Sequence, residues 1–107
     1  MSAITTHVLD VALGRPAVGV PVRLEAGDEV LAEAVTGDDG RVTDLGPDTV
    51  AAGTYRLAFG TAAYFAATGQ RGFYPEVSIT FELTDPAQHY HVPLLLAPYG
   101  YSTYRGS

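Results

Sequence analysis

Alternating apolar and polar positions dominate this chain. In the stretch PEVSITFEL, apolar residues occupy every second position from Val77 to Leu83, a pattern typical of a strand with one buried face. The stretches GVPVRLEA and GTYRLAF repeat this period. Further strands are predicted near residues 4–10, 30–36, 88–96 and 99–105, with a very short one after the turn TGDDG. Turn signals separate these runs, so the pattern predicts an antiparallel sandwich of about eight strands.

One segment, GTAAYFAATGQ, breaks the alternation. It is rich in alanine, opens with Thr61 as the expected N-cap and closes with Gly69 just past the expected C-terminus. Tyr64, Phe65 and Thr68 fall on one helical face, which predicts roughly two turns of helix packed against an edge of the sandwich. Residues 1–107 contain no repeat or linker, and we expect a single domain.

The stretch QHYHVPLLLAP combines strand alternation with chemically active residues. If Tyr90 and Val92 face the core, then His89, His91 and Pro93 share the opposite face. Because proline cannot donate a hydrogen bond to a neighbouring strand, Pro93 favours an edge strand, or one covered by something other than a strand pair. Two histidines alone rarely hold a metal. No third ligand completes a familiar spacing, so we expect no metal.

Composition excludes several classes of function. The net charge of −6 argues against nucleic acid or an anionic membrane as a partner. All six basic residues are arginine, which suits planar recognition of oxygen atoms. The absence of cysteine excludes disulfides, thiol nucleophiles and cysteine-based zinc sites. No apolar run reaches the ~18 residues of a membrane span. The first residues lack a secretory signal pattern, so we expect a cytoplasmic protein.

Three residues are ordinary when considered singly. His7 shares a strand face with Leu9, Arg41 follows the acidic turn GDDG, and His91 resembles any surface histidine. Together they are more informative, because one imidazole can act as a general base while a second orients it or acts as an acid. A guanidinium can bind an oxygen on which charge develops, and the hydroxyl of Ser107 can bind substrate or water. This set fits metal-free addition of water to an activated carbonyl.

Four separated segments carry a family resemblance that spans the chain. They are TTHVLDVALGRPAVGVPV, TGDDGR, FYPEVSITFEL and HYHVPLLLAPYGYSTYRGS, in that order. The chain resembles the transthyretin-like 5-hydroxyisourate hydrolases, and its final YRGS is the motif that separates these enzymes from transthyretin carriers. Ala97 departs from the pattern, because similar sequences often have serine there; both residues are small.

The resemblance implies an all-β, prealbumin-like sandwich of two four-stranded sheets with one short helix. It also implies a homotetramer, a dimer of dimers, whose active sites lie between subunits. The implied reaction opens the ring of 5-hydroxyisourate by hydrolysis, giving 2-oxo-4-hydroxy-4-carboxy-5-ureidoimidazoline in urate catabolism toward allantoin. No cofactor or metal is expected.

The resemblance also assigns residues to the implied site. His7 matches the histidine of the THVLD segment, Arg41 the arginine after the turn, and His91 the second histidine of HYH. The implied catalytic residues are His7, Arg41, His91 and Ser107, and Tyr104 and Arg105 join them in binding substrate. His89 has no match, and we interpret it as exposed or structural.

Three questions stay open at this point. Either His7 or His91 could be the base, and Ser107 could be a nucleophile, although a water nucleophile is favoured. A transthyretin-like carrier of small ligands, without catalysis, is the main alternative function. A purely structural sandwich domain is a second alternative. One fold can host all of these, so only the site residues favour the hydrolase.

Overall fold

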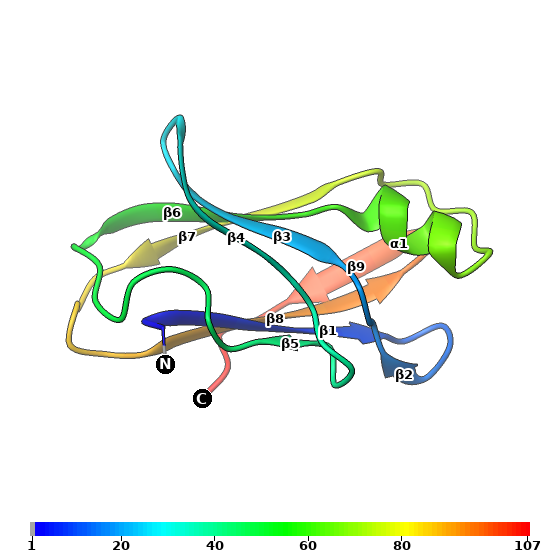
Figure 1. Cartoon of the computed structure of the whole chain (residues 1–107), viewed down its shortest axis with the longest axis horizontal. Coiled ribbons are helices and arrows are strands. Elements are labelled where there is room, and N and C mark those ends of the chain that lie inside the picture. Colours follow the sequence, from blue (N-terminus) through cyan, green and yellow to red (C-terminus); the bar gives the residue numbers. More distant parts are fainter. Residues whose placement is uncertain (1) are drawn as a thin grey trace.

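A computed structural model describes residues 2–107 as two sheets stacked face to face (Figure 1). One sheet consists of β1 (Ile4–Asp10), β2 (Arg15–Pro16), β5 (Arg41–Val42), β8 (Tyr90–Ala97) and β9 (Gly100–Thr103). The other consists of β3 (Pro21–Ala26), β4 (Glu29–Val35), β6 (Gly53–Phe59) and β7 (Val77–Leu83). The predicted class, a β-sandwich with one short helix, is confirmed.

The number of strands differs from expectation in one sheet. The first sheet runs β2–β1–β8–β9, with β5 also paired to β1, and has five strands rather than four. The additional strand is β2, which sequence analysis did not predict. Its two residues are too few to show a period. The second sheet has the order β4–β3–β6–β7 and the expected four strands.

The apolar faces of both sheets meet in one core. Leu24, Leu57 and Phe59 from the four-stranded sheet are fully buried, as are Val8 and Leu94 from the five-stranded sheet. These residues occupy the apolar positions of the alternating runs, so the alternation correctly identified the inward faces. The opposite face of the five-stranded sheet is then left for polar residues.

Strand β8 corrects the expectation drawn from Pro93. It is an internal strand, parallel to β1 on one side and antiparallel to β9 on the other. The prediction of an antiparallel sandwich is therefore wrong for this one pair of strands. The consequence of the proline is local. In β8, every second residue directs its backbone N–H and C=O groups toward β9. The regular pairing of β8 with β9 stops at Leu94, which is paired with Thr103. It resumes only at an isolated bridge between His91 and Gly106. The missing N–H therefore interrupts one ladder without making β8 an edge.

Helix α1 (Thr61–Ala67) lies at one end of the sandwich (Figure 1). The expected cap is wrong, because the N-cap is Gly60 and Thr61 is the first helical residue. The Thr61 hydroxyl instead donates to the carbonyl of Tyr74 at 2.6 Å. The C-terminal expectation is confirmed, since Gly69 follows the C-cap with a φ of +69°, a conformation that favours glycine.

A buried carboxylate joins the helix to β1. Asp10 is 1% exposed and accepts the Tyr64 hydroxyl at 2.6 Å and the Gln70 amide at 3.0 Å. It also accepts the backbone N–H groups of Ala12 and Leu13. Burial alone would raise the pKa of Asp10, but these hydrogen bonds together hold it below its usual value. Burial and the bond to this carboxylate raise the pKa of Tyr64 to about 12.

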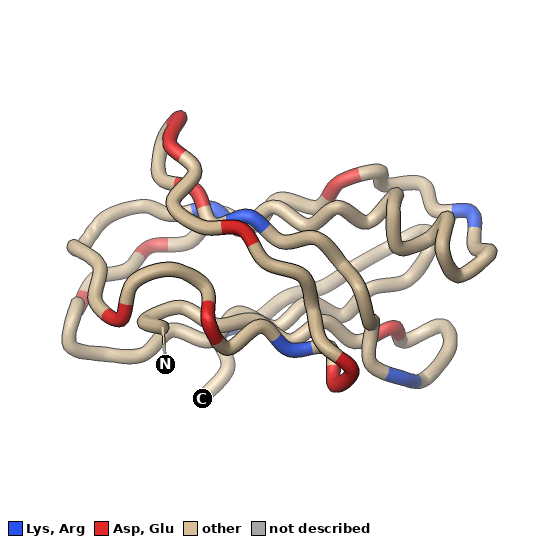
Figure 2. The backbone as a smooth tube through the Cα atoms, viewed as in Figure 1, with Lys and Arg blue, Asp and Glu red and all other residues tan. Residues whose placement is uncertain are grey.

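Charged residues are spread over the whole molecule. Figure 2 shows acidic and basic positions interspersed on both sheets and their loops. Among residues 2–107, the helix α1 has only 7 residues and does not qualify as a membrane span. The cytoplasmic location expected from the sequence stays a prediction.

We expect Asp10→Asn to destabilise the fold by about 1–3 kcal/mol at pH 7, because hydrogen bonds to a charged, buried acceptor are lost. A carboxyl with a lowered pKa in the folded state stabilises above its unfolded pKa, and this contribution fades as pH falls through the folded value. The difference in unfolding free energy between wild type and variant should therefore be largest near pH 7 and should decrease below a pH of about 4. Urea unfolding at several pH values measures it.

Asp85→Asn is the matched control. Asp85 accepts the N–H of Ala87 at 3.0 Å, but on the exposed surface. Its loss should change the unfolding free energy by less than about 0.5 kcal/mol. If the loss of unfolding free energy in Asp10→Asn does not depend on pH, then the charged carboxylate of Asp10 is not the stabilising group.

Candidate active site

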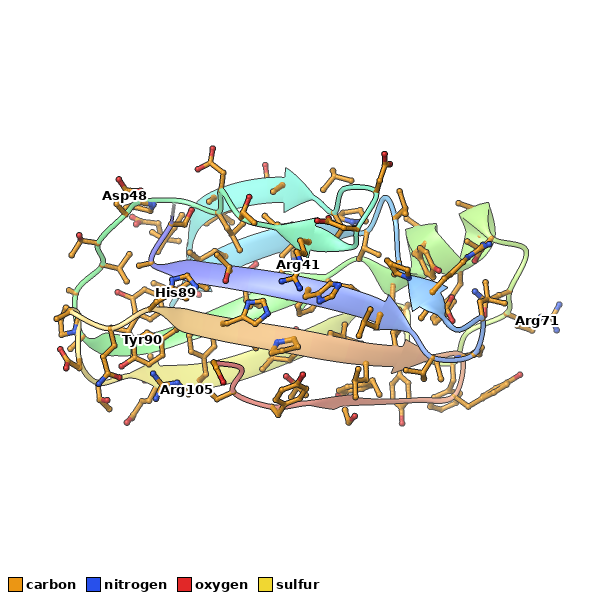
Figure 3. The ribbon with its side chains drawn as sticks, turned by 90° about the horizontal axis from the view of Figure 1, so that it is seen from below. Arg41, Asp48, Arg71, His89, Tyr90 and Arg105 are labelled. Carbon is orange, nitrogen blue, oxygen red and sulfur yellow. The ribbon has the colours of Figure 1, made fainter. Side chains whose placement is uncertain are left out.

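The candidate site lies on the outer face of the five-stranded sheet. There, the pairing of β1 with β8 and with β5 brings together residues that are far apart in sequence. Strands β1 and β8 are in register with Thr5 beside His91 and His7 beside Pro93. Strand β5 adds Arg41 directly opposite His7. Directly paired residues project from the same face of a sheet, so both histidines and the arginine share this surface. Figure 3 shows Arg41 and His89 over it.

A hollow of about 250 Å³ opens on this face. It contains three of the four predicted catalytic residues, Arg41, His91 and Ser107. The remaining lining residues are Thr5, Thr6, Thr43 and His89. His7, the fourth predicted residue, lies beside the hollow, paired with Arg41 and close enough for its charge to affect His91. We call this hollow the outer cleft.

The turn before β5 fixes His7. Its Nε2 lies 2.8 Å from the carbonyl oxygen of Asp39. Because a carbonyl only accepts, Nε2 must carry the proton and donate. In the neutral ring, Nδ1 is then the acceptor that His7 can offer to a bound molecule. The Asp39 carboxylate accepts the N–H of Arg41 at 3.0 Å, which ties the same turn to β5.

His91 is half-buried and held at one ring nitrogen. Its Nδ1 lies 2.8 Å from the Thr5 hydroxyl, which leaves Nε2 for a molecule in the outer cleft. Burial lowers the pKa of His91, and the nearby guanidinium of Arg41 lowers it further, with His7 and His89 acting in the same direction. His91 is therefore neutral at pH 7 and able to accept a proton.

The tail after β9 returns to the cleft at Gly106. The Gly106 N–H donates to the carbonyl of His91 at 2.8 Å, and Ser107 then reaches the hollow. A Cβ atom at Gly106 would lie 2.6 Å from Cδ2 of His91 and 3.3 Å from Cγ of Pro93. Only glycine therefore lets the tail pass this close to the histidine ring.

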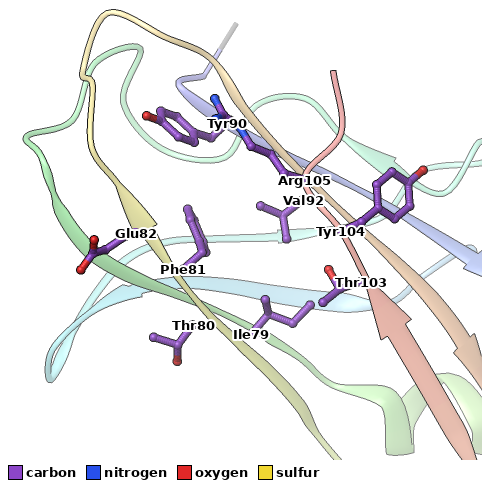
Figure 4. Close-up of a pocket in the computed structure, with 9 residues that line it drawn as sticks. All are labelled: Ile79, Thr80, Phe81, Glu82, Tyr90, Val92, Thr103, Tyr104 and Arg105. Carbon is purple, nitrogen blue, oxygen red and sulfur yellow. The ribbon is translucent and has the colours of Figure 1, made fainter.

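Tyr104 and Arg105 lie elsewhere within one chain. Both line a second hollow of about 340 Å³ between β7 and the β8–β9 edge. Figure 4 shows the Arg105 side chain directed toward Tyr90, with Tyr104 turned the other way. The Arg105 guanidinium lies 4.3 Å from the centre of the Tyr90 ring and donates to Gln88 at 3.0 Å. It anchors the tail there, and substrate binding by either residue stays a prediction.

Sequence reasoning missed four residues that line the outer cleft, Thr5, Thr6, Thr43 and His89. Thr5 gives no sequence signal beyond its place in a strand. His89 was interpreted as exposed or structural, and it is exposed. It also lines the cleft and lies 2.9 Å from the Thr5 hydroxyl. Its spacing of two from His91 was the available signal. Among residues 2–107, no three His, Asp or Glu side chains are grouped to hold a metal.

The fold and site together define a transthyretin-like sandwich with a polar cleft. The model of the HIUase/Transthyretin family matches residues 4–106, and the chain belongs to this family. The 5-hydroxyisourate hydrolase of Caulobacter vibrioides is 46% identical over the full length of both chains.

Solved structures agree. A Klebsiella pneumoniae 5-hydroxyisourate hydrolase superimposes with a TM-score of 0.91 and 41% identity, covering 100% of this chain and 94% of that one. Sea bream transthyretin in complex with thyroxine superimposes with a TM-score of 0.88 and 28% identity, covering 97% and 94%. The predicted family resemblance is confirmed. Because the fold is shared by a hydrolase and a thyroxine-binding protein, it does not separate catalysis from carriage.

We expect Gly106→Ala to displace the tail from His91, because its methyl group would meet the ring. Deuterium exchange at residues 104–107 should speed up at least tenfold, since the Gly106 hydrogen bond to His91 would be lost. Mass spectrometry of the C-terminal peptide measures this exchange. Gly100→Ala is the control, because no atom lies within 4 Å of the Cβ position there. Equal exchange in both variants would contradict the close approach.

Proposed function

We propose that this protein hydrolyses 5-hydroxyisourate to 2-oxo-4-hydroxy-4-carboxy-5-ureidoimidazoline in urate catabolism. The observation that carries the proposal is the outer cleft, where Arg41, His91 and Ser107 meet beside His7. The similarity to named 5-hydroxyisourate hydrolases over the full chain supports it.

The cleft suits this class of substrate. 5-Hydroxyisourate is small and rich in carbonyl and N–H groups, and a hollow of about 250 Å³ accommodates a molecule of that kind. A guanidinium, imidazoles and hydroxyls supply both donors and acceptors at its wall. Apart from Ser107, the groups that line the cleft lie on β1, β5 and β8 or directly beside these strands. Groups on strands hold a fixed geometry better than groups on loops.

His91 is the proposed general base. A water molecule attacks the ring carbonyl, and Nε2 of His91 takes its proton. The lowered pKa of His91, due first to burial and then to the charge of Arg41, keeps that nitrogen unprotonated at pH 7. The carbon–nitrogen bond of the ring then breaks, and the departing nitrogen receives a proton. His7 orients the water or the substrate through Nδ1.

Arg41 and Ser107 bind the substrate in this mechanism. The guanidinium of Arg41 stabilises the negative charge that develops on the attacked carbonyl oxygen, a contribution worth about 3 kcal/mol for a preorganised donor. Ser107 contributes a hydroxyl contact and not a nucleophile, because the flanking tail has a single backbone bond near it, from Gly106 to His91. No step requires a metal or a cofactor.

A second copy of the chain completes the proposed site. The outer cleft is a hollow on an open sheet face, and closing such a face removes water from the reacting groups. Among the described residues, each sheet also ends in a strand with one unpaired edge, β7 in one sheet and β9 in the other. We propose the homotetramer implied by the resemblance, with active sites between subunits.

We expect Arg41→Ala and His91→Ala each to lower kcat/KM at least 100-fold, because a charge-stabilising group or the base is removed. The substrate is made in place from urate and urate oxidase, and its ultraviolet absorbance is followed with a chelator present. Acceleration over spontaneous decay, proportional to wild-type protein, is the expected baseline.

Arg71→Ala is the matched control for Arg41→Ala. Arg71 is exposed and lies at the far end of the molecule in Figure 3, so its loss should leave the rate unchanged. Decay at the blank rate with the wild-type protein would reject the hydrolase and favour a ligand carrier. Full activity of either cleft variant would reject its assigned role.

Activity should also depend on assembly. Dilution below the dissociation range of the tetramer should reduce specific activity more than tenfold, because the cleft would lose its facing subunit. Sedimentation velocity and the absorbance assay, run on the same dilution series, test this. A monomer that sediments as such and retains full specific activity would refute the shared site.

A further inference from the structure

The hydroxyl of Thr5 joins two histidines. Its Oγ1 lies 2.8 Å from Nδ1 of His91 and 2.9 Å from Nε2 of His89. Thr5 itself is 5% exposed, so water does not compete freely for this hydroxyl. Both histidines line the outer cleft, but His91 is half-buried, whereas His89 precedes β8 and is exposed to solvent. The three side chains thus form a continuous chain from the cleft to the surface.

The Thr5 hydroxyl has one proton and can donate to only one imidazole at a time, so two neutral arrangements give a chain in which every group donates to the next. In the first, Nδ1–H of His91 donates to Thr5, and Thr5 donates to His89. Nε2 of His91 is then an unprotonated acceptor in the cleft. In the second, His89 donates to Thr5, and Thr5 donates to Nδ1 of His91. Nε2 of His91 then carries a proton. The two arrangements correspond to a base and an acid at the same atom.

We propose that Thr5 is a positioning residue that sets the tautomer of His91 and, through its hydroxyl, passes protons between His91 and His89. This inference rests on the proposed hydrolase function. It adds Thr5 and His89 to the six site residues that the family resemblance implied.

The proton balance of the relay is simple. Water gives its proton to Nε2 of His91, Nδ1–H of His91 passes to the Thr5 oxygen, and the Thr5 proton passes to Nε2 of His89. Hydroxide is left to attack the carbonyl, His91 is neutral with a proton on Nε2, and His89 is a cation. When Nε2–H protonates the departing nitrogen, the same three transfers run in reverse.

Electrostatics favour this route over a charged His91. The groups that face His91 are Arg41 from β5, His7 from β1 and His89 before β8. All are cationic or can become so, and a positive charge on His91 would be repelled by Arg41. Figure 3 shows His89 and Arg41 apart along the sheet, with His89 near the start of β8. In the single chain, water stabilises a charge on exposed His89 far better than one on half-buried His91.

The first test needs no substrate. Ring nitrogen shifts of the three histidines, measured by nitrogen-15 NMR on labelled protein, report each tautomer directly. Thr5→Val removes the hydroxyl at nearly constant shape and should move the His91 signals toward a mixture of tautomers. Thr5→Ser keeps the hydroxyl and should restore the wild-type signals. Thr36→Val is the control, because its buried hydroxyl bonds only the backbone of Ala17 and Val20.

The second test separates positioning from relay. Thr5→Val should lower kcat roughly 10–100-fold, as expected when a general base loses its orientation and proton path. Thr5→Ser should recover kcat to within about threefold of wild type. His89→Gln keeps a hydrogen bond to Thr5 but cannot take up a proton, so it should lower kcat while the His91 signals stay near wild type.

Two results would overturn the proposal. Unchanged His91 signals in Thr5→Val would remove the positioning role, and a wild-type kcat in His89→Gln would remove the relay. Because the NMR measurement contains no substrate, failure of the hydrolase itself is distinguishable. A shifted tautomer in Thr5→Val with no turnover in any protein would reject the proposed function and leave the tautomer assignment in place.

Discussion

The parallel pairing of β1 with β8 is the constraint on which the whole site depends. It joins residues more than 80 positions apart and aligns Thr5 with His91 and His7 with Pro93. Side chains alternate between faces along a strand, so a slip of one residue would send His7 or His91 into the core. Core packing prevents that slip, since Ile4, Val8 and Leu94 are all buried on the inner face. The apolar core therefore fixes the register, and the register places the chemistry.

Pro93 has a second consequence at the other side of β8. Without an N–H there, the β9 ladder ends at Thr103, whose hydroxyl instead donates to the Pro93 carbonyl at 2.7 Å. The chain leaves the sheet over two residues and returns at Gly106 beside His91. The detour places Arg105 on the inner side, against Tyr90. A residue that would weaken an ordinary central strand thus frees the tail to reach the outer cleft.

The sequence predicted the regular parts of this arrangement well. Period-two patterns in one dimension identify which face of a strand is buried, so the core and the strands around His7 and His91 followed from pattern alone. Which strands pair with each other cannot be predicted from such a pattern. The pattern gave no sign that β8 is internal or that the Thr5 hydroxyl lies between His89 and His91. The family resemblance assigned His7, Arg41, His91 and Ser107, but it assigned nothing to a threonine without a motif.

Arg41 has two electrostatic effects in the outer cleft that act in the same direction. Its positive charge favours the negative charge that develops on an attacked carbonyl, and it disfavours a proton on His91. A nearby cation keeps a base neutral. The same cation raises the free energy of the charged form that the base takes when it accepts a proton. A site with this arrangement gains if the proton moves on, away from the arginine. The imidazole of His89, reached through one buried hydroxyl, offers that path and places the charge on an exposed ring instead of a half-buried one.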